Sequence, residues 1–284
     1  MRTLTQHLLP HKIVSKIADL SANCEVTWIK NFLINYFIQR YAVKMHEAIQ
    51  EDPFAYTSYN KFFTRQLKPQ FRPIDSNPLA IISPADGALA QFGKITENQI
   101  MQAKGHTYSV QDLLANDSNA SHFINGTFAT VYLAPKDYHR VHMPLGGRLI
   151  KMIYVPGKLF SVNTHAADNI PNVFARNERV VAIFETSAGP MAIVLVGAMI
   201  VGSIETVWAG KITPPHSKKI RSEQYDKVAP IVIGKGEEMG LFKLGSTVIT
   251  LFPPQTMNWD PTVSLNMDVK MGQKIGTLIS RENV

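Results

Sequence analysis

The chain has 284 residues, of which 45% are hydrophobic and 18% are charged. This composition excludes a disordered or fibrous protein, and the length suffices for one large domain or two small ones with a sizeable core. The single cysteine, Cys24, excludes an intramolecular disulfide and favours a reducing, cytosol-facing environment.

The formal charge of +7 is concentrated near the amino terminus, where residues 1–72 hold ten Lys and Arg but five Asp and Glu. This basic quarter of the chain favours an anionic partner surface, either lipid or nucleic acid. No signal peptide is evident, because no long apolar run ends at a small-residue cleavage site. No transmembrane helix is expected, because polar residues interrupt the most apolar stretch, residues 26–43.

Residues 4–50 are expected to be helical, with a second helix starting at about Glu25. That second helix is mostly apolar, apart from a narrow polar stripe of Lys30, Asn31, Asn35 and Gln39. A broad aromatic face with flanking cations suits the headgroup boundary of a bilayer. The alternative is a buried helix packed against the domain or a partner subunit.

A short helix is expected around Tyr59–Leu67, before Pro69 and Pro73 end helical character. From Ile81 onward, short β-type runs alternate with Gly, Pro and Asn. These runs are Phe128–Leu133, Ile150–Val155, Val180–Glu185, Met191–Val201, Ile231–Ile233 and Val248–Phe252.

The run Met191–Val201 is apolar on both faces and is expected inside the β-core, whereas residues 214–227 are expected to form an exposed loop. The sequence therefore predicts an α+β protein. A helical, membrane-associating region, residues 1–72, precedes a single, mostly antiparallel β-rich catalytic domain, residues 73–284.

The first candidate site is the strand-like run Glu238–Leu244, which ends at Gly245-Ser246-Thr247. Gly245 has no Cβ, so it can adopt a strained conformation that leaves its carbonyl open to attack by the Ser246 hydroxyl. An N→O acyl shift would give an ester, and elimination would leave a dehydroalanine that hydrolyses to a pyruvoyl group and ammonia. Taken alone, this tripeptide is more typical of an ordinary turn.

The second candidate is Tyr138-His139-Arg140-Val141-His142-Met143-Pro144. Histidine can take and return a proton near neutral pH, so either imidazole could act in catalysis. Two alternatives remain open: one packed and one exposed imidazole, or a metal site. A metal site could recruit a further histidine from His106, His122, His165 and His216, although no HExxH motif is present.

The third candidate is Asp86 in Ser83-Pro84-Ala85-Asp86-Gly87, a tight turn after a strand. A loop carboxylate at such a place either serves chemistry or bonds the local backbone.

Together, these segments resemble the bacterial, pyruvoyl-dependent (prokaryotic type I) phosphatidylserine decarboxylase family. Further segments strengthen the resemblance: Tyr59-x-x-Phe62-Phe63-x-Arg65, Phe-Ser-Val-Asn at 160–163, Phe-Ala-Arg-Asn-Glu-Arg at 174–179, and residues 196–206. The resemblance covers nearly the whole chain from about residue 40, while the amino-terminal helices match in character rather than by motif.

The resemblance implies a carboxy-lyase that converts phosphatidylserine to phosphatidylethanolamine and CO₂. Asp86, His142 and Ser246 would form a self-processing triad that cleaves the chain between Gly245 and Ser246. The products would be a β subunit, residues 1–245, and an α subunit, residues 246–284, whose Ser246 becomes the covalent pyruvoyl cofactor.

In the mature enzyme His142 would protonate the α-carbon, and His139 would help to place the substrate carboxylate or phosphate. No metal and no nucleic-acid partner are expected. The family also implies a peripheral location on the cytoplasmic face of the cell membrane and a homodimer of cleaved α–β pairs.

Two other classes of function remain as alternatives. A zinc-dependent hydrolase built on His139 and His142 predicts stoichiometric metal and loss of activity to chelators. A lipid- or nucleic-acid-binding module predicts an intact single chain in which the Gly245–Ser246 bond has no role.

Overall fold

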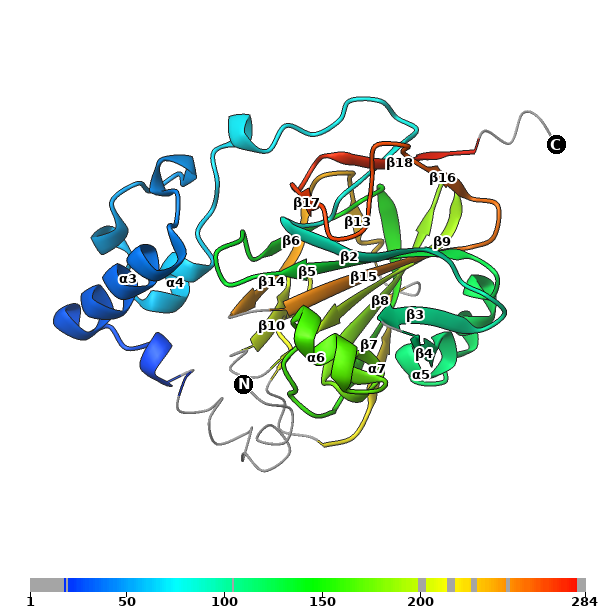
Figure 1. The fold of residues 1–284 in the computed structure, drawn as a ribbon, viewed down its shortest axis with the longest axis horizontal. Helices are drawn as coiled ribbons and strands as arrows, with labels where there is room; N and C mark the ends of the chain where they lie inside the picture. Colours follow the sequence, from blue (N-terminus) through cyan, green and yellow to red (C-terminus); the bar gives the residue numbers. More distant parts are fainter. Residues whose placement is uncertain are drawn as a thin grey trace.

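The computed structural model describes residue 18 and residues 20–103, 105–198, 203–213, 218–225, 229–243 and 246–279. Figure 1 shows a small helical part, with α3 and α4, beside a larger β-rich part. Every pairing between the named strands is antiparallel. The predicted α+β class with mostly antiparallel sheets is therefore confirmed.

The helical part is built around α3 (Thr27–Tyr41), which begins close to the predicted start at Glu25. It ends at Ala42, whose φ of 51° lies in the left-handed region. Shorter elements follow: η1 (Met45–Glu47), η2 (Pro53–Ala55), α4 (Tyr59–Phe63) and η3 (Pro69–Phe71).

Two helix predictions in this part are too long. The helix expected over 4–50 does not continue beyond Tyr41 as an α-helix, and residues 4–17 lie outside the described residues. The helix expected over Tyr59–Leu67 stops at Phe63. The reason is tertiary: the backbone near residue 67 bonds to that near residue 48, through Ile49 N–H to Gln66 O and Lys68 N–H to Glu47 O.

Helix α3 buries one face and exposes an aromatic one. Ile34 and Phe37 pack in a cluster with the aromatic residues of α4, and the predicted polar stripe is not wholly exposed, since Lys30 is buried and donates to Phe54 O at 2.8 Å. The outward face carries Trp28, Phe32 and Tyr36, which are 74%, 68% and 60% exposed. Their spacing of four residues aligns them along one side of the helix.

The largest sheet has nine strands within the described residues. In spatial order these are β12 (Arg221–Gln224), β7 (Gly147–Val155), β8 (Arg179–Thr186), β9 (Gly189–Val196), β15 (Ser246–Phe252), β5 (Thr127–Leu133), β2 (Gly87–Lys94) and β17 (Asp268–Val269), with β13 (Val232–Ile233) also paired to β7.

This sheet lies between two hydrophobic cores. Along β9, Met191, Ile193 and Leu195 contribute to one core, while Ala192, Val194 and Val196 contribute to the other. Alternation of side chains across the pleat produces this division. The prediction that this run is buried on both faces is confirmed through Val196, whereas residues 199–201 lie outside the described part.

Three smaller sheets and several short helices complete the β-rich part. The four-stranded sheet runs β11 (Gly210–Lys211), β10 (Ser203–Thr206), β14 (Glu238–Lys243), β6 (Arg140–His142). The others are β1 (Ala80–Ile82) with β18 (Lys274–Leu278) and β16 (Met257–Trp259), and the hairpin of β3 (Gln99–Ala103) and β4 (His106–Ser109). The helices are α5 (Val110–Leu113), η4 (Ser118–Phe123), α6 (Thr164–Asn169) and α7 (Val173–Arg176).

The strand predictions agree with β5, β7, β8, β13 and β15, with ends shifted by a few residues. The predicted loop over 214–227 is wrong at Arg221–Gln224, which form the edge strand β12 on β7. All four residues of β12 are exposed, as the prediction expected, and this polar edge carries no hydrophobic pattern from which a strand could be recognised. Residues 214–217 and 226–228 lie outside the described residues.

Candidate active site

Ser246 is the first residue of β15 and lies opposite Leu133, the last residue of β5. Its side chain is fully buried, and its hydroxyl has no hydrogen-bond partner in the part of the chain that the structure describes. Such an unsatisfied hydroxyl costs about 1–3 kcal/mol. Thr247 and Thr250 on the same strand have the same status, so burial alone does not distinguish Ser246. Leu244 and Gly245 lie outside the described residues.

His142 lies on β6 with both ring nitrogens engaged. Nδ1 is 2.9 Å from the carbonyl oxygen of Gly236, which can only accept, so Nδ1 carries the proton. Nε2 then accepts from the Tyr138 hydroxyl at 3.1 Å. Burial lowers the pKa of His142. The imidazole is therefore neutral near pH 7, with its basic lone pair on Nε2.

His139 is fully buried just before β6, and its ring packs on Phe63 with 4.1 Å between centroids. Its Nδ1 donates to the carbonyl oxygen of Asp137 at 2.8 Å, while Nε2 has no partner among the described residues. Burial lowers the pKa of His139 to about 3. This imidazole is also neutral near pH 7, and its Nε2 lone pair is free.

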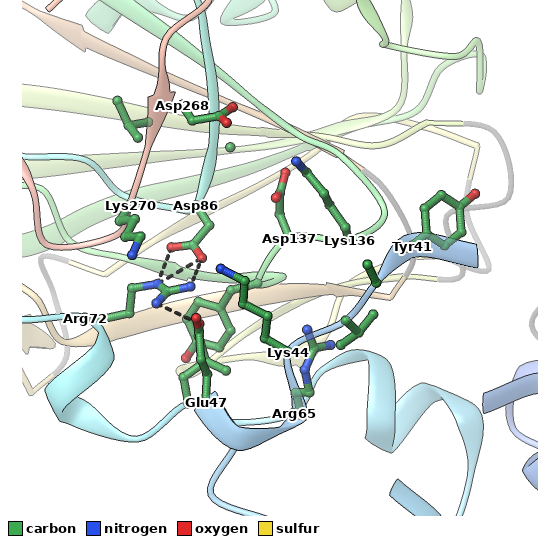
Figure 2. Close-up of a pocket in the computed structure, with 16 residues that line it drawn as sticks. Tyr41, Lys44, Glu47, Arg65, Arg72, Asp86, Lys136, Asp137, Asp268 and Lys270 are labelled. Atoms are coloured by element: carbon green, nitrogen blue, oxygen red, sulfur yellow. Dashed lines mark hydrogen bonds and ion pairs between the residues drawn. The ribbon is translucent and has the colours of Figure 1, made fainter. Parts of the chain in front are cut away.

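Asp86 lies in the turn between β1 and β2, as expected, and its carboxylate binds Arg72 rather than a histidine. Arg72 Nε donates to Oδ1 at 2.7 Å, Nη2 donates to Oδ2, and the Met271 N–H adds a bond at 2.9 Å. Arg72 also contacts Glu47 at 3.0 Å. Figure 2 shows Arg72 between these two carboxylates.

The structure brings Asp86 and His142 close without a direct bond between their side chains. The backbone N–H of His142 donates to Pro84 O at 2.8 Å, which joins β6 to the turn that carries Asp86. The resemblance implies a triad of Asp86, His142 and Ser246, but no hydrogen bond joins the Asp86 carboxylate to the His142 imidazole within the described residues. Within the described residues, the Ser246 hydroxyl forms no hydrogen bond with Asp86, His139 or His142 either.

Gly87, directly after Asp86, is required by the close approach of β2 to β5. Its φ of +153° is rare for other residues, and a Cβ at this position would lie 2.2 Å from the carbonyl oxygen of Tyr132. The glycine therefore fixes the position of Asp86 relative to the central strands.

Arg72 and Tyr138 are site residues that sequence reasoning missed. Tyr138 lies in the histidine segment, four residues before His142, and this short separation is the signal in the sequence for their contact. Arg72 was counted only as one of the amino-terminal cations. Its partner Asp86 is on a different element, and no spacing in the sequence indicates that pairing.

Metal ligation finds no support in the side-chain geometry. No group of three or more His, Cys, Asp or Glu side chains that could hold a metal ion is found among the described residues. In His142, Nε2 accepts from the Tyr138 hydroxyl and Nδ1 donates to Gly236 O, so neither nitrogen is open to a metal in this arrangement. The zinc-hydrolase alternative therefore has no ligand set in this part of the chain.

A pocket of about 210 Å³ lies beside Asp86, between the helical part and the β-rich part. Figure 2 shows its charged lining, which comes from the segment after α3, the segment around Arg65 and Arg72, the loop before His139, and the residues at β17.

Comparison with known proteins places the chain in a family. The family model described as Phosphatidylserine decarboxylase matches residues 59–277, which include Asp86, His139, His142 and Ser246. The chain belongs to the phosphatidylserine decarboxylase family. A second model, described as PSD, matches residues 1–42. The resemblance recognised in the sequence is thereby confirmed.

Relatives in this decarboxylase family are similar over almost their full length. The phosphatidylserine decarboxylase proenzyme of Pseudomonas putida strain F1 is 54% identical over 275 residues, which cover 96% of each chain. That of Pseudomonas fluorescens strain Pf0-1 has the same identity and coverage. The Bordetella petrii proenzyme is 53% identical over 272 residues, 95% of this chain and 94% of the relative.

Proposed function

We propose that the protein is a self-processing phosphatidylserine decarboxylase that forms a pyruvoyl group from Ser246 and converts phosphatidylserine to phosphatidylethanolamine and CO₂. The observation that carries this proposal is the family match across residues 59–277. The buried hydroxyl of Ser246 supports it, because that oxygen forms no hydrogen bond with any of the described residues.

Self-processing would begin with the Ser246 hydroxyl. Its oxygen attacks the carbonyl carbon of residue 245, the C–N bond breaks, and the acyl group moves to the oxygen as an ester. Removal of the Ser246 α-proton then expels the carboxylate of residue 245, and water converts the remaining dehydroalanine to the pyruvoyl group with release of ammonia. Cleavage would leave residues 1–245 as the β subunit and residues 246–284 as the α subunit.

His142 is the proposed base for this sequence, because its neutral imidazole has a lone pair on Nε2. The Tyr138 hydroxyl, which donates to Nε2, would have to rotate away before Nε2 could accept the Ser246 proton. Burial lowers the pKa of His142, and the charges of Glu238 and Asp86 act in the opposite direction. Asp86 would thus act on the imidazole through its charge, with Arg72 fixing the carboxylate.

In the mature enzyme, the pyruvoyl group would supply an electrophilic carbonyl for the substrate amine and accept the electrons released with CO₂. His142 would return a proton to the α-carbon. His139 would contribute to substrate binding, and because it is neutral it would do so by accepting a hydrogen bond at Nε2. The surrounding burial would exclude water from the site.

The outward face of α3 would place the enzyme on the cytoplasmic face of the cell membrane as a peripheral protein. Its exposed aromatic residues, with the net positive charge of residues 1–72, suit a boundary of anionic headgroups. No helix of the described residues is long and apolar enough to cross a membrane. We further propose a homodimer of α–β pairs, as the family implies.

Intact-mass measurement tests the proposal. Wild-type protein should give two fragments split before Ser246, and Ser246→Ala should stay a single chain without decarboxylase activity. Thr250→Val is the matched control, because it removes another buried, unpartnered hydroxyl from β15 and should leave cleavage intact. An uncut wild-type chain that decarboxylates phosphatidylserine would contradict the proposal.

A further inference from the structure

Arg65 differs from the other buried arginines of the described chain. Arg65 is 5% exposed, yet the buried Nε and Nη1 atoms of its guanidinium have no hydrogen-bond partner among the described residues. Arg72 is held by two carboxylates, and Arg179 donates to the backbone carbonyls of Leu113, Asp112, Ala175 and Asn177. The Arg65 guanidinium packs on the ring of Phe62 at 5.4 Å, and this contact leaves Nε and Nη1 without an acceptor among the described residues.

A buried charge with unused donors is expensive unless an opposite charge joins it. Burial accordingly lowers the pKa of Arg65. Two acidic side chains whose charges act on Arg65, Glu47 and Asp86, are already bound by Arg72. Within the described residues, Arg65 therefore has no carboxylate that is not already paired with Arg72.

The pocket that Arg65 lines carries further unpaired cations. Lys44, Lys136 and Lys270 border it, and none of them forms an ion pair or side-chain hydrogen bond within the described structure. Figure 2 shows Lys44 and Lys270 reaching toward the Arg72–Asp86 pair from its two sides. The remaining acids are weak competitors: Asp137 accepts a hydrogen bond from Ala134 N–H, and Asp268 is exposed at the rim.

We propose that this pocket binds the phosphodiester of the phospholipid headgroup, with Arg65 as the principal donor and Lys44, Lys136 and Lys270 around it. The inference rests on the proposed function, which supplies an anionic lipid as substrate. A guanidinium presents paired N–H donors that match two oxygens of a phosphate. The pocket also begins directly after α3, at Tyr41–Lys44, so it opens beside the proposed membrane-facing helix.

The chemistry favours the phosphate over the substrate carboxylate as the ligand of Arg65. A carboxylate loses its charge as CO₂ departs, so a fixed cation on it would stabilise the ground state more than the transition state. The phosphodiester keeps its charge throughout the reaction. A cation bound to it holds the substrate without opposing decarboxylation.

Binding to the uncut Ser246→Ala protein tests the site without any turnover. The probes are sn-glycero-3-phosphoserine, inorganic phosphate and L-serine, measured by calorimetry. We expect the phosphodiester to bind, L-serine not to bind, and Arg65→Met to weaken phosphodiester binding by at least about tenfold, the effect of losing one charge-assisted contact. Inorganic phosphate binding as tightly as the phosphodiester would assign the site to free phosphate and overturn the headgroup assignment.

Arg221→Met is the matched control, since Arg221 also stacks on an aromatic ring, Tyr154 at 5.2 Å, but lies on the edge strand β12. This variant should bind the phosphodiester like the parent protein. Equal affinity in the parent and in Arg65→Met would overturn the inference.

Measuring stability to urea distinguishes a structural role of Arg65 from a role in anion binding. Removing an uncompensated buried charge should leave the urea midpoint of the uncut protein unchanged or raised. A lowered midpoint together with retained phosphodiester binding would make Arg65 structural. Should Arg65→Met not fold, Arg65→Lys keeps the charge without the paired donors and should show intermediate affinity.

Kinetics separate this inference from the proposed function. In otherwise wild-type protein, Arg65→Met should raise KM for phosphatidylserine while the yield of cleaved fragments by intact mass is unchanged. Decarboxylation with no dependence on Arg65 would overturn the phosphate site alone. Arg65-dependent phosphodiester binding without any decarboxylation would overturn the proposed function and leave the anion site standing.

Discussion

Tyr138 and His142 share a hydrogen bond that sets the basicity of the proposed base. The tyrosine hydroxyl donates to Nε2, and this bond exists only while the imidazole is neutral. The bond therefore adds to the effect of burial, which already lowers the pKa of His142.

Removing that donor should shift the pH dependence of self-processing. In Tyr138→Phe the neutral imidazole loses about 0.5–1.5 kcal/mol of stabilisation, so the pKa of His142 rises. Protonation then inactivates the base at a higher pH, and the acid limb of the rate profile moves upward. The rate of fragment formation, followed by intact mass across a pH series, measures this shift.

Tyr225→Phe serves as the control, because it also removes a hydroxyl hydrogen bond, to Glu223, but one that is exposed and involves neither histidine. Its profile should match that of the wild type. An unmoved acid limb in Tyr138→Phe would show that His142 does not titrate in the rate-limiting step.

His139 should make the fold sensitive to acid. Its pKa is about 3 in the folded protein, against about 6.5 when unfolded, so the unfolded chain binds more protons between these values. The contribution of His139 to the free energy of unfolding is therefore complete above about pH 6.5. It falls as the pH drops, by at most about 1.4 kcal/mol per pH unit. Asp137 opposes this, because burial raises its pKa to about 6 and protonation below that value favours the folded state.

Urea unfolding of the uncut Ser246→Ala protein and of the same protein with His139→Gln isolates the histidine contribution. Both retain Asp137, so its effect cancels in the comparison. Between about pH 6.5 and pH 5 the His139→Gln protein should lose about 1–2 kcal/mol less stability than its parent. Parallel pH dependences of the two proteins would rule out a neutral buried His139.

At the scale of single residues, the sequence indicated which residues belong to the candidate site but not which side chains they contact. Ser246, His142 and Asp86 were singled out from short motifs, and the family match spans all of them. Arg72 and the free guanidinium of Arg65 could not be foreseen, because their surroundings come from segments distant in the chain.

Strand β2 shows how a single glycine can decide the fit of an element. Gly87 and Gly93 both lie on β2 with positive φ, at 153° and 145°, but a Cβ on Gly87 would meet the β5 backbone, whereas a Cβ on Gly93 would meet nothing within 4 Å. The two positions share the backbone strain and differ in the space available.

Alanine substitution should separate these two effects. Gly93→Ala should cost about 1–3 kcal/mol from strained backbone alone. Gly87→Ala should cost a further 1–3 kcal/mol, roughly, because β2 must move away from β5. Urea midpoints of the uncut Ser246→Ala protein measure both, and equal losses would show that the β2–β5 approach is not tight.

The exposed face of α3 makes a second prediction at this scale. Replacing Trp28 and Phe32 by Ser should lower binding to vesicles of anionic phospholipid by at least about tenfold, since each aromatic buries apolar area at the headgroup boundary. Vesicle co-sedimentation measures the change. Leu265→Ser, which alters a side chain that is 54% exposed outside the helical part, should bind vesicles normally. Unchanged binding of the α3 variant would exclude this face as the membrane contact.

Element prediction succeeded where the pattern was apolar and failed where tertiary contacts or polar edges decided. Strand β9, which is buried from Met191 to Val196, was recognisable from its continuous apolar run. The end of α4 was not, because pairing between the segments near residues 48 and 67 overrides local helix propensity. The exposed strand β12 was not recognisable either, because no hydrophobic alternation marks it.

Across the whole molecule, the predicted class is right, but the order of the strands could not be read from the sequence. Strand β15 lies between β9 and β5, which precede it by about fifty and more than a hundred residues. Hydrophobic pattern shows that β15 is buried, yet does not show which neighbours it takes. Its place in the middle of the largest sheet emerges only from the assembled fold.

Because β15 lies in the middle of the largest sheet, the proposed cleavage should affect whether the unfolded protein can refold. While the chain is whole, β15 reaches its place between β9 and β5 as part of one polymer, at a rate independent of concentration. After cleavage, a released carboxy-terminal fragment would have to reach the gap between β9 and β5 by diffusion. Its binding there would also cost the translational entropy of a second molecule. Mature protein unfolded by urea or heat should thus recover poorly on dilution, while its uncut precursor regains its fold.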